Sequence, residues 1–287
     1  MSENVSVPRK PDWLKIKLPA GVEYSEVKKN IKENRLHTIC ESGNCPNQTE
    51  CWGAGTATLM ILGNVCTRSC MFCNVATGKP ENVDIAEPFR VAESVKRMGL
   101  KHVVITSVDR DDLTDGGSKI WAATIRAIRR HCPGVTMETL IPDFQGKQEN
   151  LQYIIDVKPE VVSHNIETVK RLSREVRVQA RFERSIDVLK RLKDGGIERT
   201  KSGIMLGLGE TTEEIIEAMD DLRSASVDVL TIGQYLQPTK MHLPVKKYVT
   251  PQEFKALKDI GLAKGFSIVE SGPMVRSSYH AERHIKK

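Results

Sequence analysis

Six short apolar, β-branched segments alternate with segments of helical periodicity between residues 56 and 265, and this alternation limits the possible folds most strongly. The predicted strands lie at 56–63, 102–108, 135–141, 160–166, 202–208 and 227–234. The predicted helices lie at 87–99, 117–132, 147–157, 181–196, 211–225 and 250–265. Continuous apolar strands separated by helices form parallel sheets covered on both faces, so the pattern predicts an α/β fold. An open doubly wound sheet and a partial barrel both fit, whereas six units are too few for a closed eight-stranded barrel.

Residues that commonly begin and end helices support these boundaries. Glycines that can end helices occur at positions 99, 134, 195 and 265. Thr211 is a predicted N-cap, and Glu214 three residues later would complete a capping box. Thr250 is a second predicted N-cap, followed by Pro251 at the first helical position. The helix assignments therefore rest on both periodicity and capping.

The regions outside the alternation predict three parts. Residues 1–55 are polar and are expected to form an extension packed on the α/β core of residues 56–265, and residues 266–287 are expected to form a C-terminal tail. No apolar run approaches the ~20 residues that cross a bilayer, and the first residues lack a signal-peptide core. We therefore expect a cytoplasmic protein without a membrane partner.

The charge of the chain is modest. The 43 Lys and Arg residues exceed the 37 Asp and Glu residues by a formal net charge of +6. The basic residues are spread along the chain, with a local concentration at 189–201 that is expected to be a solvated helix face. This balance does not by itself indicate nucleic-acid binding, and we expect no nucleic-acid partner.

Cysteine usage indicates metal chemistry. Six of the seven cysteines lie between residues 40 and 73, which in a chain of this kind favours metal binding over disulfides. They form two groups of three: Cys40, Cys45 and Cys51, and then Cys66, Cys70 and Cys73. The seventh, Cys132, is expected to be a buried core thiol.

The second group has the more specific spacing, C-x3-C-x2-C, in a loop directly after the first predicted strand. Sites in α/β folds form beyond the carboxyl ends of the strands. Three thiolates can hold three corners of a cubane iron–sulfur cluster and leave the fourth iron open to a small molecule. A structural zinc site is the alternative, but it would need a fourth ligand, and this loop contains no histidine.

The spacing C-x3-C-x-aromatic-C, with Phe72 as the aromatic residue, resembles the radical S-adenosylmethionine (SAM) superfamily. The stretches 39–52, 56–75, 105–117, 164–169 and 272–281 resemble the lipoyl synthase family within it, and the likeness runs nearly the whole length of the chain. This resemblance implies a partial (βα)6 TIM-like barrel with an N-terminal cluster-binding extension and a C-terminal tail. It also implies two [4Fe–4S] clusters: one on Cys66, Cys70 and Cys73 that binds SAM, and an auxiliary one on Cys40, Cys45 and Cys51.

The resemblance implies further site residues. In this family a serine of the R-S-S-Y segment, here residues 276–279, completes the auxiliary cluster. We assign this ligand and a catalytic role to Ser278, with Ser277 as the alternative, and Arg276 beside it is a candidate for gating that cluster or contacting substrate. An oxygen ligand suits an iron–sulfur cluster less well than a thiolate, so this corner should open more easily. The expected SAM contacts are Asp115, Gly116, Gly117, Asn165, Glu167, Arg177 and Gly207, with Gly209 beside the last.

Several of these contacts have an ordinary structural alternative. Superfamily members often carry Gly-Gly-Glu where this chain has Gly116, Gly117 and a serine, so Asp115 or backbone carbonyls would replace the usual glutamate. Asn165 could equally be a turn residue, and Arg177 a surface arginine. A guanidinium does match the geometry of a carboxylate such as that of SAM.

The implied reaction is the insertion of two sulfur atoms at C6 and C8 of an octanoyl-lysine on a carrier domain. A 5′-deoxyadenosyl radical would abstract the hydrogens, two SAM molecules would be used per lipoyl group, and the auxiliary cluster would donate the sulfur. The implied partners are octanoylated lipoyl domains (2-oxoacid dehydrogenase E2 and glycine-cleavage H protein), an electron donor such as ferredoxin or flavodoxin, and an iron–sulfur carrier for cluster repair. The alternatives are another radical SAM sulfur-inserting enzyme, acting on biotin precursors or tRNA, and a zinc-bound nucleic-acid or interaction module.

Overall fold

The main sheet of the computed structural model, which describes residues 9–15 and 22–285, has eight strands in the order β1-β2-β5-β6-β7-β8-β9-β10. These strands are β1 (His37–Thr38), β2 (Thr58–Ile61), β5 (His102–Ser107), β6 (Thr136–Leu140), β7 (Val161–Ser163), β8 (Arg199–Leu206), β9 (Val229–Gln234) and β10 (Ile268–Gly272). Strand β1 pairs with β2 in the antiparallel sense, and every other neighbouring pair in this sheet is parallel. The α/β prediction is confirmed.

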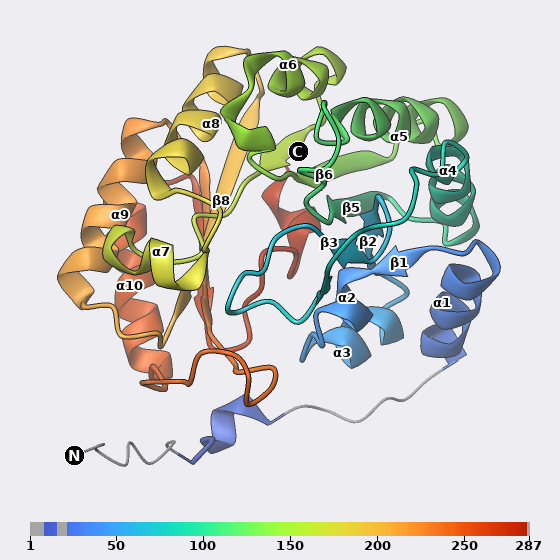
Figure 1. The fold of residues 1–287 in the computed structure, drawn as a ribbon. Helices are drawn as coiled ribbons and strands as arrows, with labels where there is room; N and C mark the ends of the chain where they lie inside the picture. Colours follow the sequence, from blue (N-terminus) through green and yellow to red (C-terminus); the bar gives the residue numbers. More distant parts are fainter. Residues whose placement is uncertain (1–8, 16–21, 286–287) are drawn as a thin grey trace.

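Helices surround the curved sheet on its outer side, and the strands lie within this ring (Figure 1). The long helices are α1 (Val22–Glu33), α4 (Glu87–Arg97), α5 (Ser118–His131), α6 (Gln148–Val157), α8 (Phe182–Asp194), α9 (Thr212–Ser224) and α10 (Pro251–Ala263). Shorter helices are α2 (Ile39–Ser42), α3 (Gln48–Gly53), α7 (Ser173–Val176), η1 (Asp12–Leu14), η2 (Phe144–Gly146), η3 (Lys170–Leu172) and η4 (Ala281–His284). Within the described residues β1 and β10 do not pair with each other, so the barrel stays open and the partial-barrel alternative is the correct one.

The predicted helix caps form as expected. Thr211 begins α9 with a capping box, in which its hydroxyl accepts from the Glu214 amide and the Glu214 carboxylate accepts from the Thr211 amide. Thr250 begins α10 in the same way, with Pro251 in the first turn. Gly195 lies at the end of α8 as predicted, and the left-handed residue is the next one, Gly196. These caps hold the βα connections that surround the site.

The N-terminal extension and the C-terminal tail both take part in the sheet. Strand β1 of the extension lies beside β2, and the fully buried Trp52 of α3 joins the same core cluster as α4 and α5. Strand β10 of the tail pairs with β9. Neither strand was predicted, because each is short and polar. The ends of the predicted parts at residues 1–8, 16–21 and 286–287 lie outside the described residues.

Two clusters of buried apolar side chains fill the barrel wall, one centred on the first half of the chain and one on the second. The inner face of the sheet is more polar: Thr106 and Thr231 line a cavity there, and Glu138 and Lys201 are completely buried. No helix in the described parts of the chain combines the length and apolarity needed to span a bilayer. The polar interior is the space in which the site lies.

Candidate functional site

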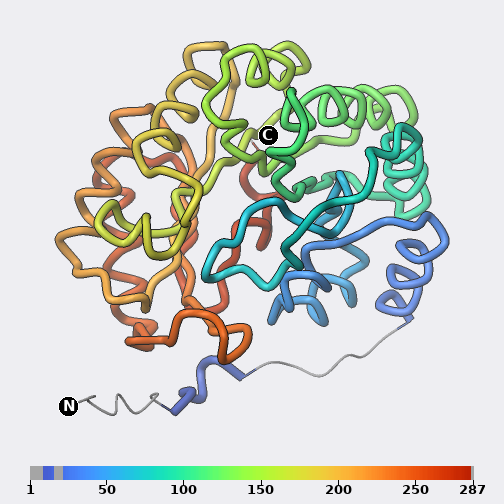
Figure 2. Tube along the Cα trace, viewed as in Figure 1, coloured from blue at the N-terminus to red at the C-terminus, as the bar shows by residue number. Residues whose placement is uncertain are grey.

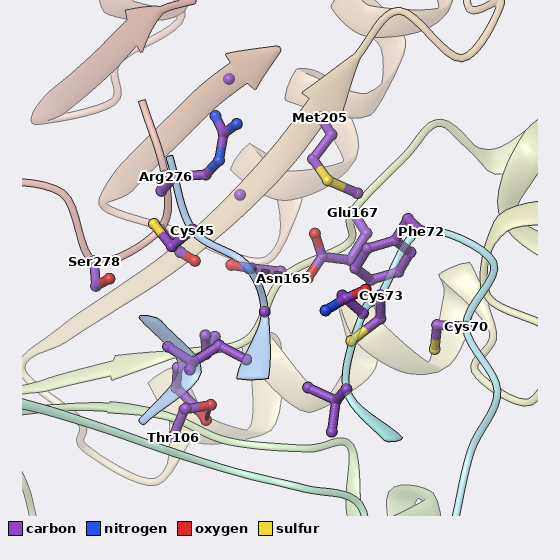
Figure 3. A pocket seen from close by; sticks show the side chains of 18 of the residues that line it. Cys45, Cys70, Phe72, Cys73, Thr106, Asn165, Glu167, Met205, Arg276 and Ser278 are labelled. Atoms are coloured by element: carbon purple, nitrogen blue, oxygen red, sulfur yellow. Dashed lines mark hydrogen bonds between the residues drawn. The ribbon is translucent and has the colours of Figure 1, made fainter. Parts of the chain in front are cut away.

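A cavity of about 600 Å³ opens inside the barrel where the strands end. Its wall includes residues from several strands and the loops that follow them, among them Thr106, Leu140, Gly203 and Thr231. Figure 3 shows Cys45 and Ser278 toward one side of this cavity and Cys70 and Cys73 toward the other. Two segments that are far apart in sequence thus meet at one cavity.

The C-x3-C-x2-C loop lies between the short strands β3 (Val65–Cys66) and β4 (Ala76–Thr77), which pair with each other. Cys66, Cys70 and Cys73 all line the cavity as free thiols. Phe72 lines it too, between the last two cysteines (Figure 3). The loop therefore presents all three sulfur atoms to the same space.

An arginine inside this loop fixes it to two neighbouring loops. Arg68 Nε donates to Asp111 Oδ2 at 2.6 Å, and Arg68 Nη2 donates to Asp111 Oδ1 at 2.8 Å. Arg68 Nη2 also donates to Asp143 Oδ1 at 2.7 Å, and Nη1 lies 3.2 Å from Asp109 Oδ1. Although burial opposes it, hydrogen bonding to Asp111 and the charges of Asp109 and Asp143 raise the pKa of Arg68. Arg68 therefore stays charged and holds the loop to the three aspartates.

The chemistry of the donors fits an iron–sulfur cluster. The amides of Arg68 and Asp109 donate to Cys66 Sγ at 3.4 and 3.3 Å, and such bonds stabilise a thiolate. Burial raises the pKa of Cys70 to about 12 and that of Cys73 to about 11. These thiols are therefore protonated at neutral pH unless a metal takes the proton's place. In the described residues no three His, Cys, Asp or Glu side chains converge on a single point, whereas a cluster takes each thiolate at a separate corner.

The first cysteine group comes from two short helices and the loop between them. Cys40 in α2 is buried, Cys51 lies in α3, and Cys45 lies between them at the cavity wall. Burial raises the pKa of Cys40 to about 11 and that of Cys51 to about 12, with the neighbouring cysteines raising it further. Cys45 contributes to the raised pKa of both Cys40 and Cys51, so the three thiols lie in one region.

The R-S-S-Y segment returns to this first group. Ser277 and Ser278 both line the cavity, and Figure 3 shows Ser278 near Cys45. The side-chain amide of Asn47 donates to the Met274 carbonyl at 2.7 Å, and the Tyr279 hydroxyl donates to Glu50 at 2.9 Å. Arg276 lines the same cavity, where the nearby Cys45 partly offsets the lowering of its pKa by burial. These contacts bring the predicted serine ligands to the first cysteine group.

Three of the predicted SAM contacts lie at the cavity. Asn165 Nδ2 donates to Glu167 Oε1 at 3.0 Å, and both side chains face the cavity (Figure 3). Burial raises the pKa of Glu167, and Arg177 opposes this rise. Arg177 is buried at the cavity wall, where it donates to Ser185 at 2.9 Å and to the Ile166 carbonyl at 3.1 Å. It is not the surface arginine that the ordinary alternative would give.

The other predicted SAM contacts are not among the residues that line this cavity. Asp115 accepts from the Gly117 amide at 3.0 Å, so this stretch forms the start of α5. A side chain at Gly207 would collide with Gln234 and the Lys247 carbonyl, which gives this glycine a packing role. Gly209 is absent from the cavity wall as well.

Sequence reasoning missed the aspartates that hold the loop. Asp109 and Asp111 lie in the stretch 109–112, directly after β5, and Asp143 follows β6. Their position after neighbouring parallel strands, together with an arginine between two cysteines, was the available signal. Burial raises the pKa of Asp109 to about 6, although Arg68 opposes this. The sequence shows the charges but not that one arginine contacts all three.

The chain is similar to known proteins over nearly its whole length. Residues 60–222 match the radical SAM superfamily, and residues 1–45 match the N-terminal domain of lipoyl synthase of the radical SAM family. "Lipoyl synthase, mitochondrial" of Nematostella vectensis is 63% identical over 287 residues, covering 99% of each chain. "Lipoyl synthase" of Flavobacterium johnsoniae is 63% identical over 283 residues, covering 99% of this chain and 98% of its own. "Lipoyl synthase" of Treponema denticola is 58% identical over 277 residues, covering 96% and 95%.

Solved structures share the fold at low sequence identity. SuiB of Streptococcus suis bound to its precursor peptide SuiA superposes with a TM-score of 0.59 at 14% identity, covering 91% of this chain and 55% of that one. HydG, a maturase of the [FeFe]-hydrogenase, superposes with a TM-score of 0.57 at 14% identity, covering 90% and 74%. These likenesses concern the fold alone.

Proposed function

Because the chain belongs to the lipoyl synthase family of the radical SAM superfamily, we propose that its two cysteine groups hold two [4Fe–4S] clusters that act in one reaction. As a member of this family it is an enzyme that inserts two sulfur atoms at C6 and C8 of a protein-bound octanoyl-lysine. When bound, SAM and its cluster supply the radical that removes hydrogen from each carbon, with two SAM molecules used per lipoyl group, and the auxiliary cluster supplies the sulfur. The single observation that carries the proposal is the meeting of Cys45, Ser277 and Ser278 with Cys66, Cys70 and Cys73 at one cavity.

The residues of the chain have separate tasks in this proposal. Cys66, Cys70 and Cys73 hold the SAM cluster, and Arg68 keeps their loop in place through its three aspartates. Asn165 and Glu167 offer polar atoms to bound SAM, and the guanidinium of Arg177 is available to its carboxylate. These residues bind and orient, because a reactive radical must form next to its target.

Cys40, Cys45 and Cys51 hold the auxiliary cluster, and Ser278 is the proposed fourth ligand, with Ser277 as the alternative. Both hydroxyls border the same cavity as Cys45, which supports either choice. The reason for an oxygen ligand is that it leaves soft iron more readily than a thiolate does.

The cavity wall between the polar groups suits an aliphatic chain. Met60, Val108, Leu140, Ile141, Ile204 and Met205 contribute apolar surface there. An octanoyl group entering this space would leave water and come close to the SAM-binding residues. The lysine end of the substrate remains attached to its carrier.

The enzyme acts on lipoyl carrier proteins, and we propose octanoylated E2 domains of 2-oxoacid dehydrogenases and the glycine-cleavage H protein as the specific ones. Ferredoxin or flavodoxin would supply electrons, and an iron–sulfur carrier would rebuild the auxiliary cluster. No nucleic acid and no membrane enters this scheme. The cytoplasmic location expected from the sequence stays a prediction.

The test uses anaerobically reconstituted protein, SAM, a reductant and an octanoyl-lysine peptide. Mass spectrometry should detect a peptide that has gained two sulfur atoms, with 5′-deoxyadenosine formed alongside. The proposal fails if protein that carries both clusters and cleaves SAM leaves the peptide without sulfur.

A further inference from the structure

A completely buried ion pair crosses the interior of the barrel below the cavity residues of the same strands. Lys201 Nζ of β8 donates to Glu138 Oε1 at 2.7 Å and to Oε2 at 2.9 Å, and neither side chain has any exposed surface. Neither residue lines the cavity. Apolar residues of similar volume often stabilise a core as well as a buried ion pair does. The pair therefore calls for a role other than packing.

The third proton of Lys201 points to the C-terminal tail. His284 Nδ1 lies 3.1 Å from Lys201 Nζ, and the His284 ring is completely buried. Glu138 Oε2 is 3.9 Å from His284 Nδ1, too far for a hydrogen bond. The ammonium of Lys201 has only donors, so Nδ1 is the acceptor in its contact with Lys201. In residues 9–15 and 22–285 the other ring nitrogen of His284, Nε2, finds no partner. Nδ1 is thus the polar contact that places this ring.

The backbone of the same residue is held as well. The guanidinium of Arg199, two residues before Lys201 in β8, donates to the His284 carbonyl. One strand therefore binds both the side chain and the main chain of a single tail residue. In Figures 1 and 2 the last described residues of the chain, in red, lie inside the ring of helices, and His284 Nδ1 is 3.9 Å from Glu138 Oε2 of β6.

The tail is fixed a second time, close to the first cysteine group. Asn47 binds the Met274 carbonyl and Glu50 binds the Tyr279 hydroxyl, and both residues lie between Cys45 and Cys51 in the sequence. Ser277 and Ser278 lie between Met274 and His284, so both serines stand between two fixed points. Few residues separate Ser278 from His284, and the last three of them form η4 together with His284. A short, folded connection transmits the position of one end to the other.

We propose that the Glu138–Lys201 pair is a socket for His284, and that this contact sets the position of Ser277 and Ser278 against Cys40, Cys45 and Cys51. His284 is then a positioning residue: it touches neither substrate nor cofactor. The third N–H of Lys201 points in one direction. Only one placement of the tail therefore brings His284 Nδ1 within reach of it. Apolar residues in place of Glu138 and Lys201 would bury the tail without favouring one placement of it. The role of the serines as cluster ligands rests on the proposed function, whereas the contact of His284 with the Glu138–Lys201 pair does not.

The experiment uses the shape of two amide side chains. Asn places its oxygen where His places Nδ1, whereas Gln places its oxygen near the position of Nε2. His284→Asn should therefore keep the contact with Lys201, and His284→Gln and His284→Ala should lose it. The matched control is Arg283→Ala, which changes an exposed neighbour in the same tail. Hydrogen exchange of residues 274–285 is followed by mass spectrometry in the full-length reconstituted protein and in the metal-free chain.

We expect exchange in this segment to be about tenfold faster in His284→Ala and His284→Gln, because a hydrogen bond to a charged group is lost. His284→Asn and Arg283→Ala should remain close to the unchanged protein. In the reconstituted variants, SAM cleavage should persist while sulfur insertion falls in His284→Ala and His284→Gln alone. If His284→Ala does not fold, the comparison of Asn with Gln still decides the matter.

The socket is refuted if Asn and Gln variants exchange alike, or if Arg283→Ala accelerates exchange as much as His284→Ala does. A different result would contradict the proposed function: wild-type protein that does not convert octanoyl-lysine. Hydrogen exchange in the metal-free chain does not depend on that conversion, so the two failures are distinguishable.

Discussion

Arg68 Nη2 donates to Asp143 Oδ1 at 2.7 Å across 75 residues of sequence, with both side chains almost fully enclosed. The contact ties the loop of Cys66, Cys70 and Cys73 to the loop that follows β6. Asp143 also accepts from Arg184 of α8 at 3.1 Å, so the aspartate keeps one cation if Arg68 is altered. Without Arg68 the cysteine loop would lose its anchor, whereas Asp143 would still be held by Arg184.

Replacing this arginine with lysine should loosen the loop. Arg68→Lys keeps the charge but loses the forked contact with Asp111, so we expect the free energy of unfolding to fall by about 2 kcal/mol. SAM cleavage should slow by about tenfold because the reacting groups are less well placed. Chemical denaturation and 5′-deoxyadenosine assays measure both.

Arg171→Lys is the matched control for this change. Arg171 makes the same forked contact with Glu214, but at the surface. Neither stability nor SAM cleavage should change measurably there. An equal effect at both positions would contradict the role assigned to Arg68.

The two cysteine groups should fail in different ways. Cys70→Ala should abolish 5′-deoxyadenosine formation, whereas Cys45→Ala should spare part of it and abolish sulfur insertion. Cys132→Ala, which removes a buried thiol outside the cavity lining, should alter neither. Liquid chromatography with mass spectrometry follows both products after iron content has been checked. Identical behaviour of Cys70→Ala and Cys45→Ala in correctly loaded protein would show that the assigned roles are wrong.

A thiolate in place of the proposed serine ligand should hold the auxiliary cluster too firmly. Ser278→Cys should keep SAM cleavage and reduce sulfur insertion, because thiolate binds iron more strongly than a hydroxyl oxygen does. Ser277→Cys is the control, and the serine whose replacement has the larger effect is the ligand. Equal, unimpaired sulfur insertion in both variants would remove serine ligation from the scheme.

Stability should depend on pH through His164. Burial lowers the pKa of this histidine to about 4, and the nearby Arg177 lowers it further. The unfolded chain takes up the proton near pH 6.5 and the folded chain does not, so stability that is present above pH 6.5 is lost as the pH falls toward 4. The loss should be about 3 kcal/mol.

Urea unfolding of the metal-free, full-length chain between pH 4 and 7.5 measures this loss. His164→Gln should remove that part of the pH dependence and leave the contributions of other groups. Parallel pH curves for the unchanged protein and the variant would contradict the prediction.

A substitution at Gly207 tests whether this glycine is needed for packing rather than for SAM binding. Gly207→Ala should destabilise the fold because the new methyl group meets Gln234 and the Lys247 carbonyl, and because φ is +105°. Gly134→Ala has a similar φ of +86° but open space around it, so it should cost only the backbone strain of about 1 kcal/mol. Gly207→Ala should cost roughly 2 kcal/mol more. Thermal unfolding without SAM measures the difference, and equal losses would argue against the packing role.

Much of the fold could be predicted because its signals are local. Six apolar strands, their helices and the capping boxes at Thr211 and Thr250 depend on neighbours within a few residues. Strand β10 escaped prediction because Glu270 and Ser271 read as loop residues, and their strand conformation depends on pairing with β9.

The site likewise has some features that depend on local sequence and others that depend on distant residues. Cysteine spacing predicts the two groups, whereas the aspartates around Arg68 and the buried pair of Glu138 and Lys201 do not stand out in sequence. Charged residues are expected at the surface. Arg68, Asp143, Glu138 and Lys201 are buried here because each meets a compensating partner 63 to 75 residues away.

The contact between Asn47 and Met274 also has a consequence for the time at which this protein becomes functional. A ribosome releases Asn47, within the first cysteine group, 227 residues before Met274 in the segment that lies over this group. Nascent chains therefore expose thiols that the finished protein partly covers. Under the proposed function, the cluster on this group can gain its serine ligand only after residues 277 and 278 have left the ribosome, so its completion follows the synthesis of most of the described fold.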